Sequence, residues 1–164
     1  MFIALESLFN GGIDELPLQY DFDFSDESVN GVFPFTTPVK LFGKILRNAE
    51  IVSVDAVIDF TLDVICDRCA ESTKLDFRLP MNHILVTEVN DEDNDDYIII
   101  EDMKLDIAEL TLEDIYLALP SKFLCSDDCK GVCPSCGVNL NTGSCSCKKE
   151  VDPRLEALLD LLND

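Results

Sequence analysis

Residues 52–69, V-S-V-D-A-V-I-D-F-T-L-D-V-I-C-D-R-C, decide the fold of this 164-residue chain. Apolar side chains occupy every second position from Val52 to Cys66, and polar side chains occupy most of the positions between them. Alternation with a period of two predicts a strand with one face on a core and one face in water. A half-buried strand of this length indicates an antiparallel sheet, because strands of parallel sheets are usually buried on both faces.

The sequence on both sides of this strand extends the predicted sheet. Residues 16–24, L-P-L-Q-Y-D-F-D-F, alternate in the same way, with Leu18, Tyr20, Phe22 and Phe24 on one face. The C-D-R-C motif is expected to form the tip of a hairpin, because an alternating segment follows it. The further strands are expected from about Val39, at 73–79, at 81–86 and at 97–100.

Three segments are expected to be helical. Residues 2–9 carry Phe2, Leu5, Leu8 and Phe9 at helical spacing. Asp106 and Glu109 form a capping box at the start of a helix that ends before Pro120. Asp152 and Pro153 are suited to begin a short terminal helix. The apolar faces of the last two helices are expected at Ala108, Leu112, Ile115 and Leu119, and at Leu155, Leu158, Leu159 and Leu162.

These segments predict an α+β protein with an antiparallel sheet, a core helix and a cysteine-rich C-terminal segment stapled by zinc. We expect two domains. Residues 1–120 form an acidic sheet domain with a helix, and residues 121–164 form the zinc-binding segment with the terminal helix.

Six of the eight cysteines lie in residues 125–147, C-S-D-D-C-K-G-V-C-P-S-C-G-V-N-L-N-T-G-S-C-S-C. Zinc prefers four soft ligands at tetrahedral corners, and a C-x-x-C turn brings two thiolates to one ion. Cys133-Pro-Ser-Cys136-Gly137 has the form of a zinc knuckle, in which the glycine accepts a left-handed conformation. We expect Cys145 and Cys147 to complete this site.

The remaining cysteines, Cys66, Cys69, Cys125 and Cys129, form a second zinc site if the hairpin tip lies beside the chain that follows Pro120. A rival partition joins Cys125 and Cys129 to Cys133 and Cys136 and leaves two pairs over, and the spacing permits both. Two zinc ions are expected. Closed four-thiolate sites are usually structural, because they keep no open position for a water molecule. Four thiolates around one zinc ion carry a net charge of −2, and Lys130, Lys148 and Lys149 nearby are expected to offset part of it.

Other chemistries have weaker signals. C-D-R-C is also compatible with a thiol redox pair, but it lacks the strand-to-helix context of such motifs. His83, the single histidine, is expected to be a surface or hydrogen-bonded strand residue. No nucleotide-binding or serine-hydrolase motif is present, so we expect no enzyme activity and no catalytic residue.

The net charge of −21 is strongly uneven along the chain. Residues 1–119 hold seven basic and 26 acidic residues, a net charge of −19. Such a surface repels nucleic acid and attracts basic proteins. The sequence lacks a secretory signal and an apolar run of about 20 residues, so a cytoplasmic protein with reduced thiols and no membrane contact is expected.

Several stretches together resemble the YceD family of bacterial large-subunit ribosomal RNA accumulation proteins. They are L-P-L-Q-Y-D-F-D-F, P-F-T-T-P-V-K-L-F-G, F-T-L-D-V-I-C-D-R-C, L-A-L-P-S-K-F-L-C-S-D-D-C-K-G-V-C-P-S-C-G-V-N-L-N and D-P-R-L-E-A-L-L-D-L-L. The resemblance covers nearly the whole chain in order. It implies a metal-binding protein without assigned catalysis that supports accumulation or processing of 23S ribosomal RNA. The family resembles this chain more consistently in the C-x-R-C pair than in the C-terminal cysteines. That difference supports Cys66, Cys69, Cys125 and Cys129 as one group.

With this resemblance, we expect a non-catalytic, zinc-binding factor in large ribosomal subunit biogenesis. The acidic surface favours a basic ribosomal protein or assembly factor as partner, with indirect or weak contact to RNA. A thiol-based redox or metal-handling protein is the alternative.

Overall fold

The computed structural model of the chain describes residues 1–88 and 97–147. Two features predicted from the sequence lie outside these residues. One is most of the acidic segment 88–96, and the other is the terminal helix after Asp152. Lys148, Lys149 and Arg154 also lie outside the described residues. Among the residues that are described, no helix is both long and apolar enough to cross a membrane.

The chain divides into two compact units, which are described separately. The first unit comprises Met1–Val64 and Thr73–Ser121, and it contains the main sheet and its helix. The second unit comprises Ile65–Ser72 and Lys122–Asp164. All eight cysteines belong to the second unit, because the C-D-R-C turn groups with the C-terminal segment and not with the sheet.

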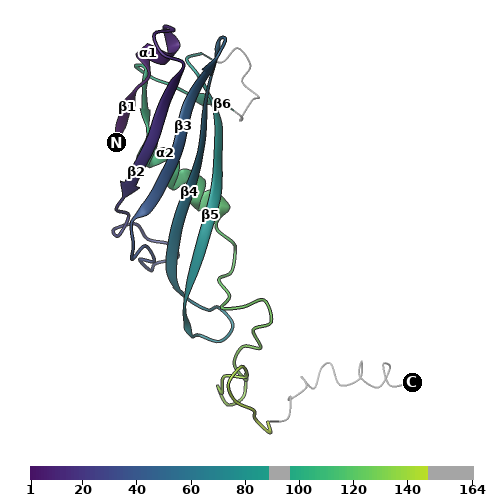
Figure 1. The fold of residues 1–164 in the computed structure, drawn as a ribbon. Helices are drawn as coiled ribbons and strands as arrows, with labels where there is room; N and C mark the ends of the chain where they lie inside the picture. Colours follow the sequence, from purple (N-terminus) through teal and green to yellow (C-terminus); the bar gives the residue numbers. More distant parts are fainter. Residues whose placement is uncertain (89–96, 148–164) are drawn as a thin grey trace, which may run out of the picture. The chain divides into compact units, whose positions relative to one another are not determined.

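A five-stranded sheet forms most of the first unit (Figure 1). Its strands follow one another in space in the same order as in the sequence. The segments predicted as strands around residues 52–66 are strands of this sheet, except that the two expected at 73–79 and 81–86 form one continuous strand. They are β2 (Glu15–Phe22), β3 (Val39–Asn48), β4 (Ile51–Ile65), β5 (Ser72–Val86) and β6 (Tyr97–Ile99).

The sheet is mostly antiparallel. β2 pairs with β3 and β3 pairs with β4 in antiparallel register. Asp59 of β4 contacts Arg78 of β5, and two residues further along β4 Thr61 contacts Asp76, so these strands also run in opposite directions. β6 corrects the prediction, because it pairs with β5 in parallel and places Tyr97 opposite Ile84.

The alternation along β4 matches the burial of its side chains. Every even-numbered residue from Val52 to Val64 is buried, and the odd-numbered residues between them are half-buried or exposed. The helix α2 (Ile107–Ala118) lies across this buried face (Figure 1), and its Asp114 contacts His83 of β5 at 2.9 Å. His83 is thus a hydrogen-bonded strand residue, as predicted.

The helix α2 begins where the capping residues predict. Asp106 accepts hydrogen bonds from the backbone N–H groups of Ala108 and Glu109 at 3.1 and 3.2 Å. Of the predicted apolar face, Ile115 is fully buried, whereas Ala108, Leu112 and Leu119 are half-buried. The fully buried positions are Ile107, Leu110, Thr111 and Ile115.

The N-terminal segment differs from the helix expected at residues 2–9. Its first part is the strand β1 (Phe2–Ala4), which pairs with β7 (Lys104–Asp106), and only Glu6–Phe9 form the short helix α1. Pairing with β7 buries Ile3 and leaves Phe2 71% exposed. The periodicity of the segment alone contains no sign of a partner about 100 residues away.

The described part of the second unit consists mainly of turns that are held by backbone hydrogen bonds. The first turn is joined to the C-terminal segment where the Asp67 N–H donates to the Phe123 carbonyl at 2.8 Å. The Asp67 carboxylate accepts from the Phe123 N–H at 2.7 Å. The Val132 N–H donates to the Arg68 carbonyl at 3.0 Å, which fixes a second point of contact.

Candidate metal centres

The cysteines of the second unit gather into two groups of four. The first cysteine cluster contains Cys66, Cys69, Cys125 and Cys129, and the second cysteine cluster contains Cys133, Cys136, Cys145 and Cys147. Within each cluster, all four sulfur atoms lie within 4.8 Å of one another. This grouping is the first of the two partitions that the spacing permits, and it separates the four cysteines that the rival partition joins.

Two arms bring the first cysteine cluster together. One arm is the turn at the end of β4, where the Cys66 N–H donates to the Glu71 carbonyl at 2.9 Å. The other arm follows Phe123 and carries Cys125 and Cys129. The Arg68 guanidinium joins the arms by donating to the carbonyl oxygen of Cys129 at 3.1 Å. Three of the four cysteines are buried, and Leu124 packs against them.

Distances in the first cysteine cluster fit a tetrahedral ion. The Cys66 and Cys129 sulfurs lie 3.8 Å apart, and the Cys69 and Cys125 sulfurs lie 3.6 Å apart. A tetrahedron with Zn–S bonds of about 2.3 Å has edges of about 3.8 Å. Disulfide-bonded sulfurs are separated by about 2.05 Å, so these thiols are free. The residues therefore fit one tetrahedrally coordinated metal ion.

The second cysteine cluster forms within one short segment. The Cys133-Pro-Ser-Cys136 turn closes when the Gly137 N–H donates to the Cys133 carbonyl at 2.8 Å. Gly137 has φ +73°, the left-handed conformation expected from the knuckle motif. Cys145 and Cys147 complete the set. Cys133 is buried, whereas the other three cysteines are exposed.

Backbone dipoles prepare one thiol in each cluster to bind a cation. Burial raises the pKa of Cys66, but backbone N–H groups of Cys125, Cys69 and Arg68 more than offset this and lower the pKa to about 6. Backbone N–H groups of Cys136 and Ser135 lower the pKa of Cys133 to about 6. The thiolate is the form that binds metal, so the lowered pKa prepares both residues to act as ligands.

Neighbouring sulfur atoms raise the pKa of other cysteines in the two clusters. Hydrogen bonding with Cys136 and burial raise the pKa of Cys147 to about 12. The pKa of Cys69 is also raised to about 12. The Glu71 backbone lowers it, but burial and the thiols of Cys66, Cys125 and Cys129 outweigh that effect. Negative charge crowded in this way favours a cation at the centre of each cluster, because a cation stabilises all four thiolates. A bound zinc ion supplies a rigid four-way cross-link without redox chemistry.

Three polar side chains around the first cysteine cluster were not found by reading the sequence. Asn141 donates through Nδ2 to the Cys129 sulfur at 3.3 Å, Asn139 donates to Glu71 at 3.2 Å, and Arg68 donates to the second arm. Of the lysines expected to offset the charge, Lys130 makes its contact through its backbone N–H, which donates to Asn141. The asparagines in the cysteine-rich segment were the one feature of the sequence that could have indicated these contacts, but asparagine is common in turns of every kind.

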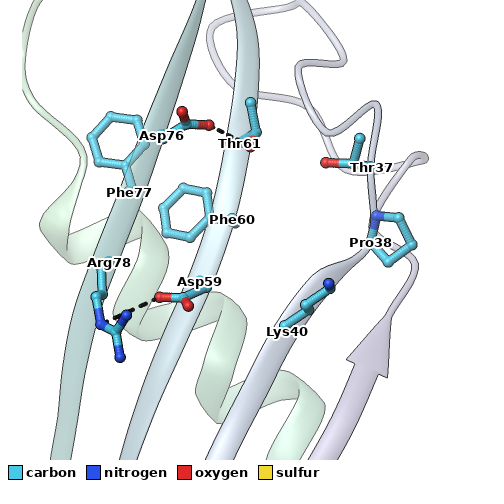
Figure 2. A pocket seen from close by; sticks show the side chains of 9 residues that line it. All are labelled: Thr37, Pro38, Lys40, Asp59, Phe60, Thr61, Asp76, Phe77 and Arg78. Atoms are coloured by element: carbon cyan, nitrogen blue, oxygen red, sulfur yellow. Dashed lines mark hydrogen bonds and ion pairs between the residues drawn. The ribbon is translucent and has the colours of Figure 1, made fainter.

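The first unit carries a separate pocket of about 590 Å³ beside β3, β4 and β5 (Figure 2). Four of its polar side chains form two contacts: Thr61 donates to Asp76 at 2.7 Å, and Arg78 lies 3.7 Å from Asp59. The rings of Phe60 and Phe77 stack at 5.0 Å beneath them. These contacts join β4 to β5 along one side of the pocket, and Thr37, Pro38 and Lys40 line the other side.

Fold and site together define a class: a sheet protein that presents two four-cysteine clusters, each positioned to bind a metal ion. The family model described as "Large ribosomal RNA subunit accumulation protein YceD" matches residues 54–162. This match covers more than half of the chain, and the chain belongs to that family. No solved structure matches.

Similar proteins occur in bacteria and in chloroplasts. The protein YlbN of Bacillus subtilis is 29% identical over 159 residues and covers 92% of each chain. A chloroplastic YCED homolog 1 of Arabidopsis thaliana, named a large ribosomal RNA subunit accumulation protein, is 27% identical over 148 residues. That match covers 72% of this chain and 46% of the plant protein. The protein Rv2926c of Mycobacterium tuberculosis is 32% identical over 63 residues, which cover 38% of this chain and 30% of its own length.

Proposed function

We propose that this protein is a non-catalytic factor in large ribosomal subunit biogenesis that supports accumulation or processing of 23S ribosomal RNA. The observation that carries the proposal is the family match over residues 54–162, a range that includes all eight cysteines. The name of the Arabidopsis relative supports the same role. The metal sites would then hold the shape of a binding surface.

Both cysteine clusters hold zinc in this proposal. Four thiolates in a tetrahedral arrangement are typical of zinc or of iron, and the closed zinc form is structural. Elemental analysis and native mass spectrometry of the purified chain should find two zinc ions per chain. A red-coloured, iron-loaded protein would contradict the choice of metal, and a mass without metal would contradict the site assignment.

The partner in this proposal is a basic ribosomal protein or assembly factor. The charge of −19 on residues 1–119 favours a protein of opposite charge and disfavours direct contact with RNA. In an affinity pull-down from its own cells, the partner should remain bound after nuclease treatment and should be released as salt rises. Neutralising the acidic residues of 88–96 should slow association. Tight binding to purified 23S RNA alone at physiological salt would contradict this partner.

The cellular role has its own test. Depleting the protein should lower 23S RNA relative to small-subunit RNA, and re-expressing the native chain should restore the ratio. A Cys66→Ser/Cys69→Ser chain should restore it poorly if the first cysteine cluster is needed. An unchanged ratio after full depletion would contradict the ribosomal role.

The thiol-based alternative gains some support from the low pKa of Cys66, about 6, which favours a reactive thiolate. Alkylation of the zinc-loaded protein separates the two functions. Metal-bound cysteines should react slowly and become reactive when a chelator is added. Rapid alkylation of Cys66 or Cys69 with the metal still bound would favour the redox alternative.

A further inference from the structure

A short stretch of the chain belongs to one cysteine cluster by sequence and contacts the other in space. Residues 138–141, V-N-L-N, lie between Cys136 and Cys145 of the second cysteine cluster. Their hydrogen bonds to residues outside the segment reach Glu71, Cys129, Lys130, Gly131, Cys133 and Gly143. The first four of these belong to the surroundings of the first cysteine cluster. We call residues 138–141 the bridging segment.

Asn141 is the member of the bridging segment that touches a ligand sulfur. Its Oδ1 accepts from the Lys130 N–H at 2.7 Å, and its Nδ2 donates to the Cys129 sulfur at 3.3 Å. A backbone N–H can only donate, so Lys130 determines which end of the amide faces it. The NH₂ end must therefore face Cys129. A hydrogen bond to the thiolate stabilises its charge and holds its orientation.

Asn139 extends the same contact to the other arm of the first cysteine cluster. Its Oδ1 accepts from the N–H and the Nδ2 of Asn141 at 2.9 and 3.0 Å, and its own Nδ2 donates to Glu71 at 3.2 Å. The carbonyl of Glu71 accepts from the Cys66 N–H. The two asparagines thus connect the turn that carries Cys66 with the arm that carries Cys129.

The closure of the second cysteine cluster fixes where the bridging segment lies. The Cys133 N–H donates to the Val138 carbonyl at 2.8 Å, directly beside a ligand. The Leu140 N–H donates to the Gly131 carbonyl at 2.9 Å, and the Gly143 N–H donates to the Asn139 carbonyl at 2.9 Å. With Cys136 and Cys145 held at one centre, the residues between them form a closed loop with few alternative conformations.

We propose that Asn141 is a positioning residue for the Cys129 thiolate and that it couples the two cysteine clusters, so that metal in the second strengthens metal binding in the first. This inference rests on the proposed metal binding. Emptying the second cluster frees the bridging segment, and the hydrogen bond to Cys129 is then lost. Coupling between two binding sites is reciprocal, so metal in the first cluster strengthens binding in the second by the same factor.

Cobalt(II) titration of the full chain tests the coupling, because cobalt–thiolate bands report each tetrahedral site. A Cys145→Ser/Cys147→Ser chain isolates the first cysteine cluster, and a Cys66→Ser/Cys69→Ser chain isolates the second. Loss of a hydrogen bond to a ligand typically lowers metal affinity by about 10- to 100-fold. We expect a loss of this size at the first cluster when the second is removed. An unchanged affinity would overturn the coupling.

Asn141→Asp tests the residue itself with all eight cysteines intact. It keeps an oxygen for Lys130 and replaces the donor at Cys129 with a carboxylate oxygen. The first cluster should lose affinity by a similar factor, and its sulfur-to-cobalt band should move to lower energy. Asn48→Asp, an exposed amide at the end of β3, is the matched control and should change neither. An Asn141→Asp chain with native affinity and spectrum would overturn the assignment.

Combining the changes shows whether the coupling runs through Asn141. In the Cys145→Ser/Cys147→Ser chain, the further change Asn141→Asp should lower the cobalt affinity of the first cluster by a much smaller factor than it does in the chain with all eight cysteines. If the two losses of affinity simply added, coupling through Asn141 would be overturned. A native chain that binds no cobalt would contradict the proposed metal binding, whereas two ions bound independently would contradict the coupling alone.

Discussion

The two C-x-x-C turns differ at one equivalent position, which is alanine in the first turn and glycine in the second. The residue after the second cysteine is left-handed in both turns, with φ +58° at Ala70 and +73° at Gly137. Glycine adopts this conformation freely, whereas an L side chain is strained there by roughly 1–2 kcal/mol. A Cβ on Gly137 would meet no atom within 4 Å, so backbone strain alone governs its replacement.

Exchanging these two residues should therefore have opposite effects. Gly137→Ala should weaken metal binding at the second cysteine cluster by roughly 1–2 kcal/mol, the cost of the left-handed alanine. Ala70→Gly should strengthen the first cluster by a smaller amount, because glycine also gains freedom in the unfolded chain. Chelator competition measures both. A change of the same sign in the two variants would contradict the argument from backbone conformation.

At the scale of elements, the helix α2 depends on its N-terminal cap. Asp106 accepts from two backbone N–H groups of the first turn and from the Met1 ammonium at 2.7 Å. The ammonium hydrogen bond and these N–H groups hold the pKa of Asp106 below its ordinary value of 3.8. The charged form is thus favoured in the folded state.

Asp106→Ala should destabilise the first unit by about 0.5–2 kcal/mol near neutral pH, the usual cost of losing such a cap. The contribution of Asp106 is present above pH 3.8 and is lost as pH falls through its lower folded pKa. The difference between native and variant chains in denaturant unfolding should therefore shrink in strong acid. Asp106→Asn, which keeps a capping oxygen, is the control. A difference that grows in acid would contradict the assigned cap.

A helix or strand could be predicted from the sequence where a single property of its residues, such as hydrophobicity, determines which side chains are buried. The alternation from Val52 to Val64 identified β4, because hydrophobicity alone places those side chains. The buried face of α2 was identified only in part: Ile115 was predicted, but Thr111 was missed, since it is polar and is buried with its hydroxyl donating to the Ile107 carbonyl at 2.6 Å. A threonine whose hydroxyl is hydrogen-bonded within its own helix can be buried in the core, but the hydrophobic pattern of the sequence does not mark it as a core residue. The pairing of β1 with β7 depends on distant residues and leaves no local trace.

At the scale of the whole molecule, the two units hold their shape by different means. The first unit buries a core of large apolar side chains, among them Leu41, Ile45, Ile58, Leu62 and Ile115. In the described part of the second unit, the buried side chains are Phe123 and four cysteines: Cys66, Cys69, Cys129 and Cys133. Spacing marked the cysteines as candidate metal ligands but permitted two partitions, and both the observed grouping and the hydrogen bond from Asn141 to Cys129 depend on the folded unit.

Metal removal should therefore act on one unit and spare the other. A domain with few buried apolar groups depends on metal for its folding, whereas a sheet with its own core does not. After chelation, hydrogen exchange should show lost protection at residues 65–72 and 122–147 and retained protection in β2, β3 and the central part of β4. Adding zinc back should restore the lost protection. If chelation unmasked the sheet amides to the same degree, the first unit would depend on the metal too, and the division of the chain into an apolar-core unit and a metal-held unit would be wrong.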